Sequence, residues 1–295
     1  MHRVKRAGVV ALALAALLLM DRPWGPRPLQ RAEWLTAGDV KVRTVRAGHG
    51  DTTLVFLHGY SESLLSFHGP FDVLANRYRV VALDVPGFGV SDKPAGPYDL
   101  AAQTARLSDF LDRWTTGPLV LVGHSMGGEL ATSLALRRPD RVVALVLVSP
   151  AGYGLSQRLD SMTPGTIGLI GWAGAFATTG IMPVHDRGWL SEPDSAADYS
   201  PATDPAYRAA LESILHTFDF AALRDSFSHV HQPTLLIWGR LDPTIPFAIG
   251  ESIAVRLPCR RFEALNATLH RPQLTDPDTV SSLMLDFLRE PRCAP

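Results

Sequence analysis

Short continuous runs of apolar residues recur along most of the chain, with helix-like stretches between them. Runs rich in Val, Ile and Leu are typical of strands that are buried on both faces of a parallel sheet. They predict strands at Val40–Val45, Thr53–Leu57, Arg79–Leu83, Leu119–Val122, Val142–Val148 and Thr234–Trp238. Helical patterns lie between these runs, for example at Leu100–Trp114 and Gly127–Arg137. The alternation predicts a layered α/β fold.

The alternation stops after Val148 and resumes at Thr234. An insertion of this size between two strands is expected to fold as a small cap over the carboxyl edge of the sheet, where ligands bind in such folds. The predicted organisation is residues 1–25 as a signal peptide or membrane anchor, 26–151 and 232–295 as the two parts of the core, and 152–231 as a cap or lid.

The N-terminus combines a basic start with an apolar run. Arg3, Lys5 and Arg6 precede the uncharged stretch from Ala7 to Met20. At about 1.5 Å per residue this stretch spans about 21 Å, which is shorter than the roughly 30 Å hydrocarbon core of a bilayer. It fits a secretory signal, but no small-residue cleavage site follows it. The expectation is an exported or inner-membrane-anchored protein; an uncleaved anchor and a cytoplasmic location stay open.

The net charge and the cysteine and histidine content of the chain indicate which partners and metal sites to expect. The chain has 295 residues, a formal net charge of -1 and a sequence pI of about 6.8. This charge gives no reason to expect a nucleic-acid partner, which would need many Lys and Arg contacts to phosphates. Two cysteines, Cys259 and Cys293, are too few for a disulfide scaffold or a zinc cluster, and whether they pair is left open. His229 and His231 have the spacing of a metal pair but lack a third ligand, so no metal site is expected.

The central chemical motif is Gly123-His124-Ser125-Met126-Gly127, which has the form G-x-S-x-G. It follows the apolar run Leu119–Val122 directly and precedes a helical pattern. A sharp turn from a strand into a helix forces its middle residue into a strained backbone and exposes the serine oxygen at the start of the helix. The motif in this context predicts Ser125 as a nucleophile.

A serine nucleophile needs a base and a group that orients the base. Asp242 lies in the turn that follows the buried run Thr234–Trp238, and His270 lies in a later loop after the short strand-like stretch Arg261–Leu265. The order Ser, acid, His is the order of this type of site. The rival position for the acid, after Val142–Val148, reads Ser149-Pro150 and carries no carboxylate. The predicted catalytic residues are therefore Ser125, His270 and Asp242.

An oxyanion hole requires two backbone N–H groups that point to the developing charge. Met126, which follows the nucleophile, is expected to supply one of them. Tyr60 is expected to supply the other, because His58-Gly59-Tyr60 follows the strand Thr53–Leu57 and Gly59 allows a close backbone approach.

Taken together and in order, these motifs resemble the α/β-hydrolase fold family. The matching residues are His58–Tyr60, Asp84–Asp92, Gly123–Gly128, Gly239–Asp242 and His270, and the resemblance extends from about residue 38 to 290. It implies a mostly parallel, doubly wound, eight-stranded sheet with a helical cap, and a Ser-Asp-His triad that needs no cofactor. Asp84–Asp92 is interpreted as structural. Leu269 and Glu129 depart from the family pattern, which usually has a glycine before the histidine and a small residue four positions after the serine.

The substrate is expected to meet an apolar cap. No charged residue occurs between Met162 and Val184, and Trp172 and Phe176 in this stretch are the candidate pocket residues. The expected reaction is hydrolysis of a small-molecule or lipid-like carboxylic ester with an apolar acyl or alkyl part. Related sequences on this scaffold also imply carbon–carbon bond hydrolysis, cofactor-free peroxidation or, more remotely, ligand binding without turnover.

Overall fold

An eight-stranded sheet forms the centre of the molecule. The computed structural model describes residues 30–154, 189 and 204–291. The strands are β1 (Ala32–Ala37), β2 (Val40–Ala47), β3 (Thr53–Leu57), β4 (Arg79–Leu83), β5 (Leu119–His124), β6 (Val142–Val148), β7 (Thr234–Gly239) and β8 (Arg260–Leu265). Their order across the sheet is β1-β2-β4-β3-β5-β6-β7-β8. β2 pairs antiparallel with β1 and β4, and the other neighbours are parallel. The predicted fold class is confirmed.

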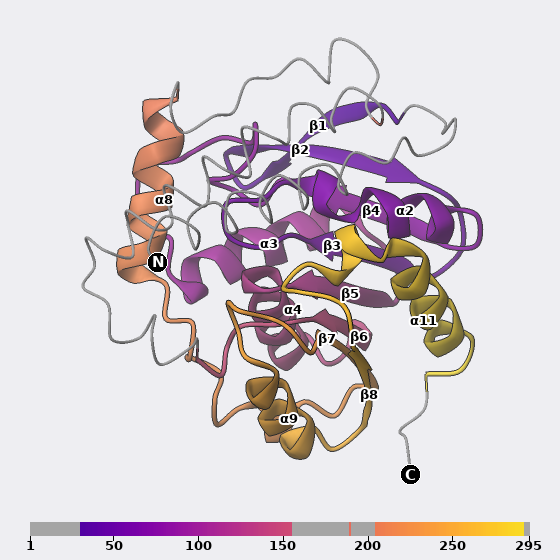
Figure 1. The fold of residues 1–295 in the computed structure, drawn as a ribbon. Coiled ribbons are helices and arrows are strands. Elements are labelled where there is room, and N and C mark those ends of the chain that lie inside the picture. Colours follow the sequence, from indigo (N-terminus) through magenta and orange to yellow (C-terminus); the bar gives the residue numbers. More distant parts are fainter. Residues whose placement is uncertain (1–29, 155–188, 190–203, 292–295) are drawn as a thin grey trace, which may run out of the picture.

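Helices cover both faces of this sheet (Figure 1). They are α2 (His68–Ala75), α3 (Leu100–Trp114), α4 (Met126–Arg137), α8 (Pro205–Thr217), α9 (Phe247–Arg256), α10 (Pro272–Thr275) and α11 (Pro277–Arg289), with short 3-10 turns η1 (Leu64–Phe67) and η3 (Phe227–His229). α2 packs against α11, and α3 packs against α4. Because parallel crossovers are right-handed and the strand order reverses at β3, these two pairs lie on opposite faces.

The parallel strands are buried because helices cover both of their faces. Every residue of β3, β5 and β7 is buried, and Trp238 of β7 is the largest fully buried side chain. Its indole N–H donates to the Ile245 carbonyl at 3.1 Å, so its one polar group is satisfied. Burying a large apolar side chain contributes roughly 1.5–3 kcal/mol, which makes these strands a rigid base for the loops at their carboxyl ends.

The hydrophobic pattern located the buried strands but missed an edge strand. β4 and β6 have the bounds that the sequence predicts, whereas β1 was not predicted. β1 lies at the edge of the sheet, alternates between buried and accessible positions, and leaves Trp34 54% exposed. It therefore lacks the continuous apolar run that marks the central strands.

α8 is the main described element of the predicted cap, and in Figure 1 it stands at the side of the molecule opposite α11. Asp204 caps it by accepting hydrogen bonds from the N–H groups of Ala206 and Tyr207. Lys93 Nζ lies 3.7 Å from Asp204 Oδ2, and the Tyr60 hydroxyl donates to the Leu211 carbonyl. Loops of the core therefore contact α8 both at its first turn, through Lys93, and at its middle, through Tyr60.

Some expectations concern residues beyond those that the structure describes. The N-terminal segment 1–25 and the pocket candidates Trp172 and Phe176 lie outside the described residues, as does most of the expected cap. Within the described ranges, no helix is both long enough and apolar enough to span a bilayer. Cys259 is disulfide-bonded; Cys293, the only other cysteine of the chain, lies outside the described residues.

Candidate active site

Ser125 occupies the turn between β5 and α4 in a strained backbone conformation. Its φ is 51° and its ψ is -120°, a region that residues with a side chain rarely adopt. Gly127 makes the turn sterically possible, because an added Cβ there would lie 2.0 Å from the Leu57 carbonyl oxygen. The motif therefore holds the serine at the end of a buried strand and at the start of a helix.

The three predicted catalytic side chains form one hydrogen-bonded chain. His270 Nε2 lies 3.0 Å from Ser125 Oγ, and His270 Nδ1 lies 2.7 Å from Asp242 Oδ2. The second carboxylate oxygen of Asp242 accepts the N–H groups of Thr244 and Ile245 at 2.8 and 2.9 Å. Asp242 is fixed from both sides, so it holds His270 with Nδ1–H towards the carboxylate and leaves Nε2 to accept the serine proton.

Neighbouring strands bring the acid and the base together. Asp242 follows β7 and His270 follows β8, and these two strands pair in parallel. An added Cβ on Gly239 would lie 2.2 Å from the Leu269 carbonyl oxygen, so the glycine lets the two loops touch. Ser149, at the rival acid position after β6, is buried and has a φ of 41°.

His270 is set up as a neutral base. Burial lowers its pKa below the usual value for histidine, against the hydrogen bond with Asp242, which raises it; the nearby His124 lowers it further. A neutral imidazole near neutral pH is the form that can take a proton from a serine hydroxyl.

The two predicted oxyanion donors are backbone N–H groups in the loops next to Ser125. Among the described residues, neither the Tyr60 N–H nor the Met126 N–H donates to another protein group. Gly59 brings the Tyr60 loop against the nucleophile, since an added Cβ on Gly59 would lie 3.2 Å from Ser125 Cβ. Unpaired N–H groups beside a nucleophile are what an oxyanion hole requires.

Sequence reasoning missed three charged or polar residues that surround this site. Glu62 is buried; its Oε2 accepts the Gly59 N–H at 3.0 Å and lies 3.1 Å from His124 Nδ1, and its Oε1 lies 2.8 Å from Arg271 Nε. Burial alone would raise the pKa of Glu62, but His124, Arg271 and the hydrogen bonds hold it well below its usual range. The sequence placed His124 beside the nucleophile but assigned it no role, and no periodic pattern marks Glu62 or Arg271.

Glu129, which departs from the family pattern, is a buried carboxyl with a different environment. It is fully buried on the first turn of α4, and within the described part of the chain neither of its oxygens has a hydrogen-bond partner. Burial raises its pKa well above the usual value, and Asp219 raises it further; the nearby Ala222 N–H, which donates to the Asp219 carbonyl, opposes this only weakly. Its surroundings therefore favour the protonated, neutral form of this carboxyl.

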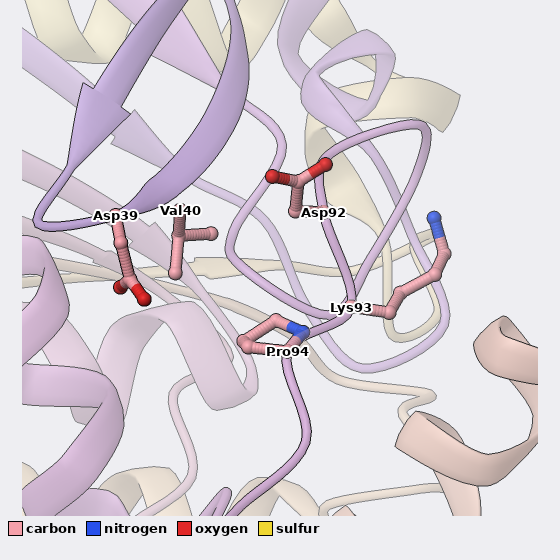
Figure 2. Close-up of a pocket in the computed structure, with 5 residues that line it drawn as sticks. All are labelled: Asp39, Val40, Asp92, Lys93 and Pro94. Atoms are coloured by element: carbon pink, nitrogen blue, oxygen red, sulfur yellow. The ribbon is translucent and has the colours of Figure 1, made fainter.

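A separate pocket of about 260 Å³ lies away from these residues. Asp39, Val40, Asp92, Lys93 and Pro94 line it, and in Figure 2 the Lys93 amine points away from Asp39 and Val40. It contains none of the predicted catalytic residues. Among the described residues no cluster of three His, Cys, Asp or Glu side chains could hold a metal ion.

Comparisons with known proteins agree with this geometry. A family model described as alpha/beta hydrolase fold matches residues 52–277. The uncharacterized hydrolase YugF of Bacillus subtilis is 28% identical over 252 residues, which cover 81% of this chain and 91% of that protein. A 2-hydroxy-6-oxononadienedioate/2-hydroxy-6-oxononatrienedioate hydrolase of Burkholderia vietnamiensis is 28% identical over 85% of this chain and 92% of its own. A crystal structure of a bacterial membrane phospholipase A superposes with a TM-score of 0.72 at 22% identity and covers 100% of both chains.

Proposed function

Since the chain belongs to the α/β-hydrolase fold family, we propose that this hydrolase is a serine esterase that cleaves carboxylic esters with an apolar acyl or alkyl part. The observation that carries the proposal is the hydrogen-bonded chain from Ser125 through His270 to Asp242, next to two backbone N–H groups that have no partner within the described ranges. These are the parts that acyl transfer requires: a nucleophile, a base, a group that orients the base and a site for negative charge.

The proposed reaction has two halves. Ser125 Oγ attacks the ester carbonyl while its proton passes to His270 Nε2, and the N–H groups of Tyr60 and Met126 bind the oxyanion. His270 then gives the proton to the leaving alcohol, and an acyl-serine remains. In the second half His270 takes a proton from water, which attacks the acyl group; the acyl–Oγ bond then breaks, His270 returns the proton to Ser125 Oγ, and the acid leaves. Asp242 stabilises the imidazolium in both halves, and the chemistry requires no cofactor.

The charges near the site favour an uncharged ester over a dicarboxylate. The relative from Burkholderia vietnamiensis is named for hydrolysis of dioates, whose carboxylates need cationic partners. The cation next to the predicted base, Arg271, is already paired with Glu62. In addition, the sequence from Met162 to Val184 contains no charged residue. Both observations support a small-molecule or lipid-like partner with an apolar chain. Carbon–carbon bond hydrolysis is the second candidate, because two relatives that the chain matches over most of their length are named as hydrolases of 2-hydroxy-6-oxo dioates, in which a carbon–carbon bond is the one to cleave.

Hydrolysis rates on two substrate classes test the proposal. Purified protein is mixed with p-nitrophenyl esters from acetate to laurate and, separately, with a 2-hydroxy-6-oxo-dienedioate, with Ser125→Ala as the control. We expect ester hydrolysis that disappears in Ser125→Ala, and little turnover of the dioate. Faster turnover of the dioate would replace esterase by carbon–carbon hydrolase. Tight ligand binding with no turnover of either class would contradict both.

We also propose that the protein is exported or anchored to the inner membrane. The basic residues up to Arg6 followed by the apolar run Ala7–Met20 support this. The disulfide-bonded Cys259 supports it too, because disulfides persist mainly in oxidising compartments. Cell fractionation with an intact-mass measurement tests the proposal; reduced protein in the cytoplasmic fraction would contradict it.

A further inference from the structure

Glu62 is one buried carboxylate that three separate chain segments share. It contacts the N–H of Gly59 in the predicted oxyanion loop, the ring of His124 just before the nucleophile, and the side chain of Arg271 just after the predicted base. Its side chain is only 3% exposed. These are the three segments that carry the groups of the proposed reaction, so a single side chain connects all of them.

His124 extends this connection to the backbone of the base. Its Nε2 lies 2.8 Å from the His270 carbonyl oxygen, and the two imidazole rings have centroids 4.8 Å apart. A carbonyl oxygen can only accept, so Nε2 must carry a hydrogen. At the other side of the ring, Nδ1 faces the Glu62 carboxylate, which is ionised and also only accepts. Both ring nitrogens therefore donate, which is the hydrogen-bonding pattern of an imidazolium.

The neighbouring His58 shows the contrasting pattern. Its Nδ1 lies 2.8 Å from the Gly59 carbonyl oxygen, and its Nε2 accepts the Val85 N–H at 3.0 Å. One nitrogen donates and the other accepts, so His58 is satisfied as a neutral ring. Burial lowers its pKa, against the carboxylate of Asp84, which agrees with the neutral form.

We propose that Glu62 and His124 form a positioning pair in which the carboxylate holds a cationic His124, and that this cation fixes the backbone of His270 while Glu62 fixes the oxyanion loop. Among the described residues, the hydrogen bonds and ion pair given above end on the Gly59 N–H, the Arg271 guanidinium and the His270 carbonyl, and not on Ser125 Oγ or the ring nitrogens of His270. The pair acts through His270 and Gly59, and it keeps the distance between the base, the nucleophile and the oxyanion donors constant through the reaction. The inference rests on the esterase proposal only for its kinetic test.

A second consequence concerns the charge that forms on His270. The groups that face His270 are the carboxylates of Asp242 and Glu62 and the ring of His124. Asp242 and Glu62 favour protonation of His270, and His124 opposes it. Removal of the cation at position 124 is therefore expected to move the acid limb of the kcat/KM profile to higher pH. A residue that only supported the fold would not move this limb.

Two substitutions of His124 separate its contacts. His124→Gln can keep an amide N–H near the position of Nε2, towards the His270 carbonyl, whereas His124→Asn can keep one near Nδ1, towards Glu62. We expect the acid limb of the kcat/KM profile to move to higher pH in both variants. We expect the larger loss of kcat, about 10- to 100-fold, in His124→Asn, because a base displaced by a fraction of an ångström loses rate steeply. KM is expected to change little. Unchanged kcat and an unchanged acid limb in both variants would overturn the proposal.

Glu129→Gln is the matched control for Glu62→Gln. Both glutamates are buried near the nucleophile, but among the described residues no hydrogen bond joins the Glu129 carboxyl to the loops that carry Gly59 and His270. Glu62→Gln is expected to lower kcat about 10- to 100-fold, because a Gln amide cannot accept from Gly59, His124 and Arg271 at once. Glu129→Gln is expected to keep kcat. Equal losses in the two variants would mean that burial, and not the pair, is what matters.

A measurement without turnover separates this inference from the esterase proposal. In protein labelled with ¹⁵N-histidine, with His124 assigned through His124→Gln, we expect both ring nitrogens of His124 to be protonated at neutral pH and Nε2 of His58 to be unprotonated. This result would stand even if no ester were hydrolysed, in which case the esterase proposal alone would fall. An unprotonated nitrogen on His124 in an active enzyme would overturn the positioning pair and leave the esterase proposal intact.

Discussion

Two buried glutamates near the nucleophile have pKa values that are shifted in opposite directions. Glu62, on the side of the oxyanion loop, meets a backbone N–H, an imidazole and a guanidinium, and its pKa is held well below the usual range. Glu129, on the side where the chain enters the predicted cap, packs against Gly152 with no hydrogen-bond partner among the described residues, and its pKa is raised well above the usual range. Burial is similar in both cases. The partners of a buried carboxyl, and not its depth alone, therefore set the direction in which its pKa shifts.

The largest effect is expected for a third buried carboxylate, Asp242. Asp242→Asn keeps the shape but offers His270 an amide, which favours the wrong tautomer, so kcat is expected to fall by about 10⁴-fold. The free energy of unfolding is expected to change much less. Steady-state ester kinetics with a urea titration measure both quantities. A loss of kcat below tenfold would show that Asp242 does not orient the base.

Glu62→Met removes the buried carboxylate whose pKa is lowered. It leaves Arg271 and His124 without their carboxylate, and breaking a buried ion pair by removal of one partner costs about 3–5 kcal/mol. We expect a loss of this order in the free energy of unfolding, measured by urea denaturation. Because Met fills a similar volume, Glu129→Met serves as the control and is expected to lose far less. Similar losses in both variants would remove the distinction between the two glutamates.

Glu129→Gln tests the raised pKa of Glu129 through the pH dependence of stability. The pKa of Glu129 is raised by burial, so its proton stabilises the folded protein below the unfolded-state value of about 4.3, and this contribution is lost as pH rises through the folded-state pKa. Gln cannot ionise. The stability gap between Glu129→Gln and the wild type is therefore expected to move in favour of the variant between pH 5 and pH 8, on the order of 1–3 kcal/mol. Thermal midpoints at the two pH values measure it, and a gap independent of pH would refute the raised pKa of Glu129.

The smallest effect is expected for an exposed pair at the edge of the sheet. Arg46 and Glu33 form an ion pair between β2 and β1, with side chains 43% and 36% exposed. Solvent screens such pairs, and they contribute about 0–1 kcal/mol. Glu33→Gln is expected to lower the free energy of unfolding by less than 1 kcal/mol, and less again at high salt. A larger loss would show that exposure is a poor guide to the strength of ion pairs in this protein.

The sequence predicted most of the fold and the order of the site, because both leave local signals. Continuous apolar runs mark the strands that helices cover on both faces, and the pattern Gly123–Gly127 marks the turn that holds Ser125. Asp242 and His270 could be placed because each follows a strand in the expected order. The edge strand β1 was missed, since half-exposed residues leave no continuous run.

The contacts of Glu62 could not be predicted in the same way. Glu62 and His124 are 62 residues apart in the chain, and His124 and the His270 carbonyl are 146 apart. Pairing between polar side chains on distant loops has no period and no spacing rule, so it becomes visible only when the loops are placed in space. The sequence did single out Glu129 as unusual, but the rise in its pKa follows from a burial that the sequence does not reveal.

Labelling with a fluorophosphonate tests the central claim, that His270 activates Ser125 as a nucleophile. The reagent reacts with activated serines whatever the natural substrate, and intact-mass and peptide measurements locate the adduct. We expect one adduct on Ser125 in the wild type, none in Ser125→Ala, and labelling slower by at least about 100-fold in His270→Gln, in line with the size of general base catalysis. A folded wild-type protein that stays unlabelled, or one labelled at another residue, would contradict the account.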